Sequence, residues 1–235
     1  RHYCGRLGKV PNCQAGVFLT YVSERVQTLV DASLYLPAEW AEDPEHCRAA
    51  GVPETVSYQS KADLALASLR QTQKAGHLKG RWVTADEDYG KVPTFRDALN
   101  AEGWLYVLEV PYGMPVFSQR VKTEVPAWCG RGRKPSRPRL VEGEPGPQSV
   151  AEVAQNVAAA DWRVLTVAEG AQGPRSYEFA AQRVWESRDD LPGAECWLVL
   201  RRNLDGSELK CYLSNAPADT LLSELAYVGS MRWSI

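Results

Sequence analysis

Asp86 is the residue whose type and position best suit metal chemistry. It ends the short apolar run 81–85, which is typical of a β-strand, and it precedes Glu87, Asp88 and Gly90. Ligand sites in open α/β sheets lie at the carboxyl ends of the strands, and carboxylate oxygens are ligands that Mg²⁺ prefers. The position therefore indicates a metal ligand. The alternative is a residue that only caps the turn after the strand.

A cluster of five cations within nine residues is the second candidate. It lies in a stretch rich in Gly and Pro and contains Arg131, Arg133, Lys134, Arg137 and Arg139. The sequence Arg-Gly-Arg-Lys-Pro is close to an AT-hook core, which lays arginines into a narrow minor groove, although the lysine interrupts the usual Arg-Gly-Arg-Pro. The cluster therefore predicts a flexible loop that contacts DNA. The alternative is a solvated linker.

The composition argues against several other kinds of chemistry. The six cysteines include no Cys-x-x-Cys pair and the three histidines are scattered, so reduced thiols are favoured over a zinc or redox site, and nothing favours a catalytic triad. No apolar run approaches the roughly 18 residues of a transmembrane helix, and no signal peptide is visible, so no membrane association is expected. Because the formal net charge is −2, any DNA-binding prediction depends on local clusters.

The first half of the chain alternates between strand and helix patterns. Strand-forming residues at 13–22, 26–30 and 34–36 predict a hairpin or a meander. Ser60 and Asp63 form a capping box for a helix that ends near Gly76. A strand at 81–86, a helix at 93–103 and a strand at 104–110 follow. Short connections between such elements are typical of a parallel α/β sheet.

The second half has a different character. An exposed loop is expected at 126–149 and a weak helix at 150–160. Strands are then predicted at 164–167, 177–185, 196–200 and 209–213, and Asp205-Gly206 indicates a hairpin between the last two. This half is therefore mostly antiparallel. A final helix is predicted from Asp219 or Thr220, with Leu221, Leu225, Val228 and Ile235 on one face, and the chain is expected to continue beyond it.

Short sequence blocks, in a fixed order, cover nearly the whole chain. They are Arg1-His2-Tyr3-Cys4-Gly5, Gly8-Lys9-Val10, Asn12-Cys13-Gln14, Leu34-Tyr35-Leu36-Pro37, Trp40, Asp43-Pro44, Cys47-Arg48-x-Ala50-Gly51-Val52-Pro53, Lys61, Leu64-Ala65, Thr84-Ala85-Asp86-Glu87-x-Tyr89-Gly90, Tyr106-Val107-Leu108 and Arg232-Trp233-Ser234-Ile235. Together they resemble the catalytic domain of DDE superfamily endonucleases from bacterial insertion sequences. The resemblance is weakest from about residue 115 to 195.

The resemblance implies an RNase H-like fold in which two Asp and one Glu bind two divalent ions, Mg²⁺ or Mn²⁺. Asp86 matches the second Asp. The first Asp is expected upstream of Arg1 and the Glu directly after Ile235, so a chain truncated at both ends and an inactive fragment are expected. Arg232 matches the Arg of a Tyr-x-x-Arg-x-x-x-Glu-x6-Lys signature and is expected to contact DNA. Gly229 replaces the signature's Tyr, which leaves any role of a Tyr open.

The fold implied by this resemblance is an α/β, RNase H-like mixed sheet with helices, interrupted by a β-rich insertion. Residues 1–114 would form the first part of the core without its first strand. Residues 115–215 would form the insertion subdomain, and residues 216–235 would begin the core helix that leads to the catalytic Glu.

The implied function is a DNA transposase that cleaves and joins phosphodiesters at transposon ends. Double-stranded DNA is the expected partner, and a cytoplasmic, nucleoid-associated homodimer is the expected complete form. A non-catalytic DNA-binding remnant of a transposase is the alternative. An RNase H-like nuclease unrelated to transposition is a third possibility, but it does not explain the long β-rich segment. The sequence does not specify the terminal repeat or the target.

Overall fold

The structure, a computed structural model, describes residues 8, 13–77, 79–170 and 173–232. The sequence blocks at 1–5, 9–10 and 12 and the predicted helical position of Ile235 lie outside the described residues. The chain divides into two compact units. Unit 1 comprises residues 1–81, 94–101 and 234–235, and unit 2 comprises residues 82–93 and 102–233.

Unit 1 contains the predicted hairpin, with a helix packed against it. Strands β1 (Ala15–Val22) and β2 (Gln27–Tyr35) pair antiparallel. Helix α3 (Lys61–Ala75) contacts both strands, and its Ser68 hydroxyl donates a 2.5 Å hydrogen bond to Asp31 of β2. The predicted hairpin is therefore confirmed, and α3 covers it.

The boundaries of α3 follow from local sequence. The Ser60 side chain accepts from the Asp63 backbone N–H, the Asp63 carboxylate accepts from the Ser60 N–H, and Gly76 ends the helix in the left-handed conformation. Both ends are as predicted. Unit 1 also contains α1 (Ala38–Ala41), α2 (Pro44–Ala49) and all of α5 (Pro93–Ala101) except its first residue. Helix α5 confirms the helix predicted from Pro93.

Unit 2 is built on one mixed sheet. Its strands are β3 (Trp82–Ala85), β4 (Leu105–Val110), β5 (Pro115–Phe117), β8 (Gln148–Ser149), β9 (Arg163–Gly170), β10 (Gly173–Arg188), β11 (Leu191–Arg202) and β12 (Leu209–Ser214). The order is β3-β4-β12-β11-β10-β5-β8, with β9 also paired to β10. Only β3 and β4 are parallel, and the other pairs in this sheet are antiparallel.

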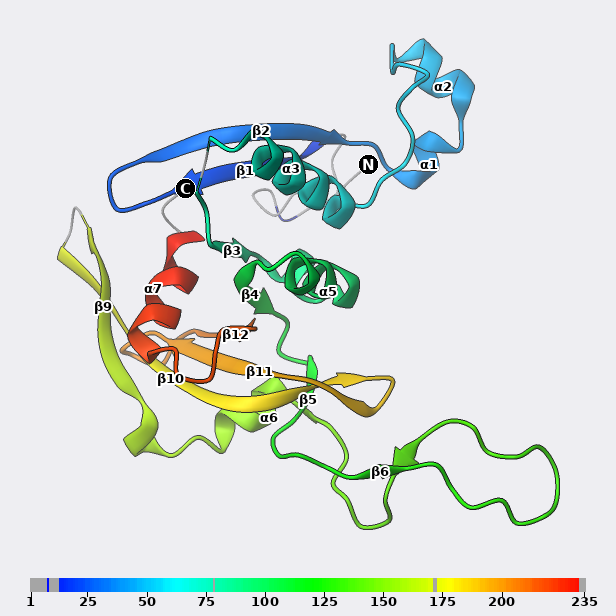
Figure 1. The fold of residues 1–235 in the computed structure, drawn as a ribbon. Helices are drawn as coiled ribbons and strands as arrows, with labels where there is room; N and C mark the ends of the chain where they lie inside the picture. Colours follow the sequence, from blue (N-terminus) through cyan, green and yellow to red (C-terminus); the bar gives the residue numbers. More distant parts are fainter. Residues whose placement is uncertain (1–7, 9–12, 78, 171–172, 233–235) are drawn as a thin grey trace. The chain divides into compact units, whose positions relative to one another are not determined.

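The two faces of this sheet carry different hydrophobic clusters. Leu198 and Leu200 of β11 belong to the cluster that includes helix α6 (Val150–Gln155), whereas Val199 belongs to the cluster that includes helix α7 (Leu222–Met231). Because side chains alternate along a strand, α6 and α7 cover opposite faces (Figure 1). A 3₁₀ turn, Ala159–Asp161, connects α6 to β9.

The architecture is therefore mixed α/β, with a large mixed sheet and seven α-helices in the described residues. The predicted parallel pair is confirmed, and so are the antiparallel strands of the second half. β12 pairs directly with β4, so the strands after residue 114 continue the sheet that holds β3 and β4. The compact units do not divide at residue 114 or 215, and the predicted insertion boundaries stay a prediction.

One detail of the final helix was predicted wrongly. Leu221 is the N-cap of α7, has extended backbone angles and is 68% exposed. It therefore does not follow the helical spacing that buries Leu225 and Val228. Among the described helices, none is long and apolar enough to cross a membrane.

Candidate active site and DNA-contacting loop

Asp86 lies directly after β3, at the carboxyl end of the strand, as predicted. It is half-buried, and its Oδ1 accepts a 3.1 Å hydrogen bond from the Asp88 backbone N–H, which caps the short helix α4 (Glu87–Gly90). The capping alternative is thus confirmed as geometry. One carboxylate oxygen makes this bond, and capping does not prevent the other from binding a cation, so the two roles are compatible.

The residues after Asp86 differ in what they can contribute. Asp88 forms a 2.7 Å ion pair with Lys91, and the hydrogen bond from Lys91 to Asp88 raises the pKa of that lysine. Burial, together with the charges of Asp86 and Asp88, raises the pKa of Tyr89 to about 12. Tyr89 therefore keeps its proton at neutral pH, and Glu87 is exposed.

Helix α4 approaches the backbone of β4 closely. A Cβ atom added to Gly90 would lie 1.9 Å from the Glu109 carbonyl oxygen. Gly90 is therefore the residue that lets the helix capped by Asp86 lie against the end of β4. The β3–β4 ladder ends with Ala85 opposite Leu108, so Asp86 and Glu109 are the next residues of the two neighbouring strands.

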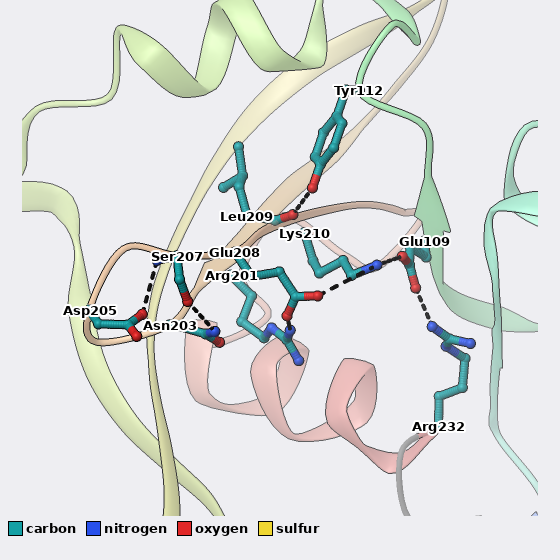
Figure 2. A network of polar contacts seen from close by, with 10 residues as sticks. All are labelled: Glu109, Tyr112, Arg201, Asn203, Asp205, Ser207, Glu208, Leu209, Lys210 and Arg232. Carbon is teal, nitrogen blue, oxygen red and sulfur yellow. Dashed lines mark hydrogen bonds and ion pairs between the residues drawn. The ribbon is translucent and has the colours of Figure 1, made fainter. Parts of the chain in front are cut away.

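Glu109 is a buried carboxylate held between two cations. Its Oε1 accepts a 2.7 Å bond from Lys210 Nζ of β12, and its Oε2 accepts from the Arg232 guanidinium at the end of α7. Figure 2 shows the network continuing to Glu208, which lies 4.0 Å from Lys210 and pairs with Arg201 of β11 at 2.5 Å. Charges of alternating sign therefore connect α7 to three adjacent strands.

These charges set the protonation of their neighbours. Burial lowers the pKa of Lys210, but its hydrogen bond to Glu109 and the charges of Glu109 and Glu208 outweigh burial, so the pKa lies above the ordinary value. Burial and the charge of Glu109 raise the pKa of Cys211 to about 12. Lys210 is therefore a cation and Cys211 an unreactive thiol at neutral pH.

The described residues supply only part of a metal site. Within them, no group of three or more His, Cys, Asp or Glu side chains is arranged to hold a metal ion. Asp86 fits as one ligand, since it is a carboxylate at a strand end. Glu109 fits poorly, because both of its oxygens already accept hydrogen bonds from cations.

Four residues of the basic cluster lie on a loop between two short paired strands, and Arg139 begins the second of these strands. β6 (Thr123–Glu124) and β7 (Arg139–Leu140) pair antiparallel, and the chain between them forms a long loop (Figure 1). The five predicted basic residues are all exposed: Arg131, Arg133, Lys134, Arg137 and Arg139. The indole N–H of Trp128 donates a 3.2 Å bond to the Gly132 carbonyl and stabilises the turn that carries Arg131.

The predicted site residues make contacts with different elements of the structure. Arg232 lies on Glu109, Asp86 caps α4, and the loop cations extend from the β6–β7 pair. The position of Arg232 does not test its predicted contact with DNA. Among the described residues, no disulfide joins Cys13, Cys47, Cys129, Cys196 or Cys211, and Cys4 lies outside the described residues.

Sequence reasoning missed Glu109 and Lys210. A signal was present, since Glu109 is an acid within the otherwise apolar strand Leu105–Val110, and a buried carboxylate requires a cationic partner. A further hollow of about 1380 Å³ lies within unit 1, lined in part by Tyr35, Trp40 and His46. It includes neither Asp86 nor the loop cations, so it does not contribute to the predicted site.

Comparison with known proteins identifies the family. No individually curated protein matches the chain significantly. A family model described as DDE superfamily endonuclease matches residues 1–174, which include β3, Asp86, β4 and the β6–β7 loop. Since this match covers well over half of the chain and contains the strand end that carries Asp86, the protein belongs to the DDE superfamily of endonucleases.

Proposed function

We propose that this chain is part of the catalytic domain of a transposase that cleaves and joins DNA at transposon ends. Membership in the DDE superfamily implies a nuclease that acts on DNA. The observation that carries the proposal is Asp86, a carboxylate at the carboxyl end of a strand in a parallel pair, within the matched region. An RNase H-like core is part of the proposal, and a parallel pair within a larger mixed sheet is compatible with it.

We propose Asp86 as one ligand of a two-ion Mg²⁺ or Mn²⁺ site. Such ions, when bound, activate an attacking water or 3′-hydroxyl and stabilise the leaving oxygen. The contribution of this chain is to hold one carboxylate in place through the α4 cap. Further carboxylate ligands are required, because the described residues supply one.

The experiment that tests this function uses the protein expressed from the complete reading frame. The substrate is DNA that contains the ends of the mobile element, with Mg²⁺ or Mn²⁺ added. Metal-dependent cleavage at the ends supports the transposase. DNA binding without cleavage would support the non-catalytic remnant, and cleavage without preference for the ends would support a nuclease unrelated to transposition.

The 235-residue chain by itself is expected to produce no metal-dependent nicking. One carboxylate leaves most of the coordination to water, which cannot hold two ions at a fixed spacing. Nicking of supercoiled plasmid, measured with and without Mn²⁺, checks this expectation. Nicking that disappears in Asp86→Asn would show that the chain carries a complete site.

We propose that the β6–β7 loop contacts DNA phosphates or the minor groove. Exposed cations that neutralise phosphates release counterions, so affinity falls steeply with salt. The Arg131→Ala/Arg133→Ala variant is expected to flatten the slope of log affinity against log salt by about two units, one for each arginine. Fluorescence anisotropy with duplex DNA over a salt series measures the slope.

A matched control removes two exposed arginines from outside the loop. Arg25→Ala/Arg163→Ala changes the net charge equally, and both side chains are exposed. The slope of this control is expected to stay close to that of the wild type. Equal slopes in wild type, loop variant and control would mean that the loop is a solvated connector.

The proposed complete form remains a cytoplasmic, nucleoid-associated homodimer.

A further inference from the structure

We infer that Glu109 and Arg232 form a positioning pair that fixes the end of α7 against the end of β4, beside the strand that carries Asp86. Glu109 is then not a metal ligand, although it follows Leu108 in β4 as Asp86 follows Ala85 in the neighbouring strand. Arg232 is then not a DNA contact. The inference rests on the proposed function only where it refers to Asp86 and to cleavage.

The first support is the burial of the pair. The Glu109 side chain is 5% exposed and that of Arg232 is 21% exposed. The two residues are 123 positions apart in the chain, and their bond joins α7 directly to β4. A carboxylate as well removed from water as Glu109 requires cations that compensate its charge, and Arg232 is one of the two that do so.

The second support is the occupancy of the Glu109 oxygens. Oε2 accepts from Arg232, and Oε1 accepts from Lys210, whose raised pKa keeps it charged at neutral pH. A divalent cation at this carboxylate would replace one of these bonds and lie beside two positive charges. The carboxylate is therefore matched to its two protein cations and not to a metal ion.

The third support is the way the rest of α7 packs. Leu225, Ala226 and Val228 belong to the cluster that contains Val107 of β4, and a Cβ on Gly229 would lie 3.2 Å from Val107 Cγ1. Apolar packing thus fixes the middle of the helix, while the ion pair fixes its last residue. Arg232, the C-cap of α7, is therefore held near the end of β4, beside the end of β3.

Thermal melting of a double-mutant cycle tests the pair. Glu109→Gln and Arg232→Met are each expected to lower Tm by roughly 6–20 °C, because the first removes the acceptor shared by Arg232 and Lys210 and the second leaves Oε2 of the buried Glu109 without this donor. The double variant is expected to melt no lower than the worse single variant. Additive losses would overturn the pairing.

A second pair in the same sheet provides the matched control. Arg183 and Glu195 lie 3.0 Å apart, with side chains 26% and 45% exposed. Glu195→Gln is expected to lower Tm much less than Glu109→Gln, because water reaches the more exposed Glu195 position and replaces the lost bond. The comparison separates the effect of burial from the effect of removing a charge.

Cleavage kinetics of the complete protein, at a temperature where every variant is folded, distinguish positioning from stability alone. Glu109→Gln is expected to lower kcat by about 10²-fold, as a small misplacement does, with the midpoint of the Mn²⁺ titration unchanged. Arg232→Lys is expected to recover part of the rate lost in Arg232→Met. An unchanged kcat in the folded Glu109→Gln variant overturns the positioning role, and a raised Mn²⁺ midpoint in that variant would make Glu109 a ligand.

DNA binding gives the last readout. The Arg232→Met variant is expected to keep the wild-type slope of log affinity against log salt, whereas loss of a phosphate contact would flatten it by about one unit. A flattened slope overturns the assignment of Arg232. If the wild-type protein does not cleave DNA, the proposed function fails, while the melting cycle and the salt slope still decide whether the pair exists and what Arg232 contacts.

Discussion

Asp86→Asn is expected to abolish cleavage of transposon-end DNA by the complete protein, with a loss on the order of 10³-fold or more. A metal ion supplies several kcal/mol of stabilisation to a charged transition state, and each 1.36 kcal/mol is worth about ten-fold in rate. The change replaces one carboxylate oxygen by an NH₂ group and so removes the negative charge that retains the ion. The rate of strand cleavage as a function of Mn²⁺ concentration measures the loss.

Asparagine is the informative replacement because Asp86 also caps α4. An amide oxygen accepts the Asp88 N–H as well as a carboxylate does, so Asp86→Asn preserves the cap, whereas Asp86→Ala costs about 1 kcal/mol of stability. Unchanged Tm and DNA affinity are therefore expected in Asp86→Asn. Wild-type cleavage in this variant would leave the residue with its capping role alone.

Glu87→Gln is the matched control for Asp86→Asn. It removes the adjacent carboxylate in the same helical turn, but the Glu87 side chain is exposed and lies outside the strand end. Near-normal cleavage is expected. If both variants lose activity equally, the effect reflects the negative charge of the α4 segment and not a ligand at Asp86.

Local features of this fold were predictable from the sequence because their causes lie within a few residues. The ends of α3 follow from Ser60, Asp63 and Gly76, and the β11–β12 turn follows from Asp205-Gly206, where Gly206 has φ 73°. Each depends on a side chain or backbone conformation that the neighbouring backbone requires. The strand pattern of residues 163–214 was predictable for the same reason.

Long-range pairing was not predictable in this way. The pairing of β12 with β4 joins residues about a hundred positions apart, and nothing in either strand specifies the other. The sequence showed that 105–110 and 209–213 are strands but did not show that they are neighbours. The predicted insertion at 115–215 therefore did not specify which core strand its own strands would pair with.

The candidate site shows the same limit. Asp86 was identified because a strand end is a local pattern. A helix cap and a metal ligand can both occupy that position, so the sequence left both roles open. Glu109 was missed because its meaning depends on Lys210 and Arg232, which come from elements far along the chain. A carboxylate within an apolar strand is a sign of such a network, although it does not say which cations complete it.

Gly90→Ala is expected to destabilise the protein by about 3 kcal/mol, near the upper end of overpacking penalties. The added Cβ would lie 1.9 Å from the Glu109 carbonyl oxygen and 2.9 Å from its carbon, and both atoms are backbone. No side-chain rotation relieves this contact, so α4 must move away from β4. For a chain of this size the loss lowers Tm by roughly 6–12 °C.

Gly113→Ala is the matched control, because a Cβ there meets nothing within 4 Å and the backbone is not left-handed. Its Tm is expected to stay near that of the wild type. Since α4 begins at the Asp86 cap, the shift forced by Gly90→Ala also displaces the proposed ligand. Cleavage should therefore fall in Gly90→Ala even below its melting temperature, while Gly113→Ala keeps both properties. Equal melting of the two variants would show that α4 does not abut β4, and the fixed placement of Asp86 next to Glu109 would then lose its structural basis.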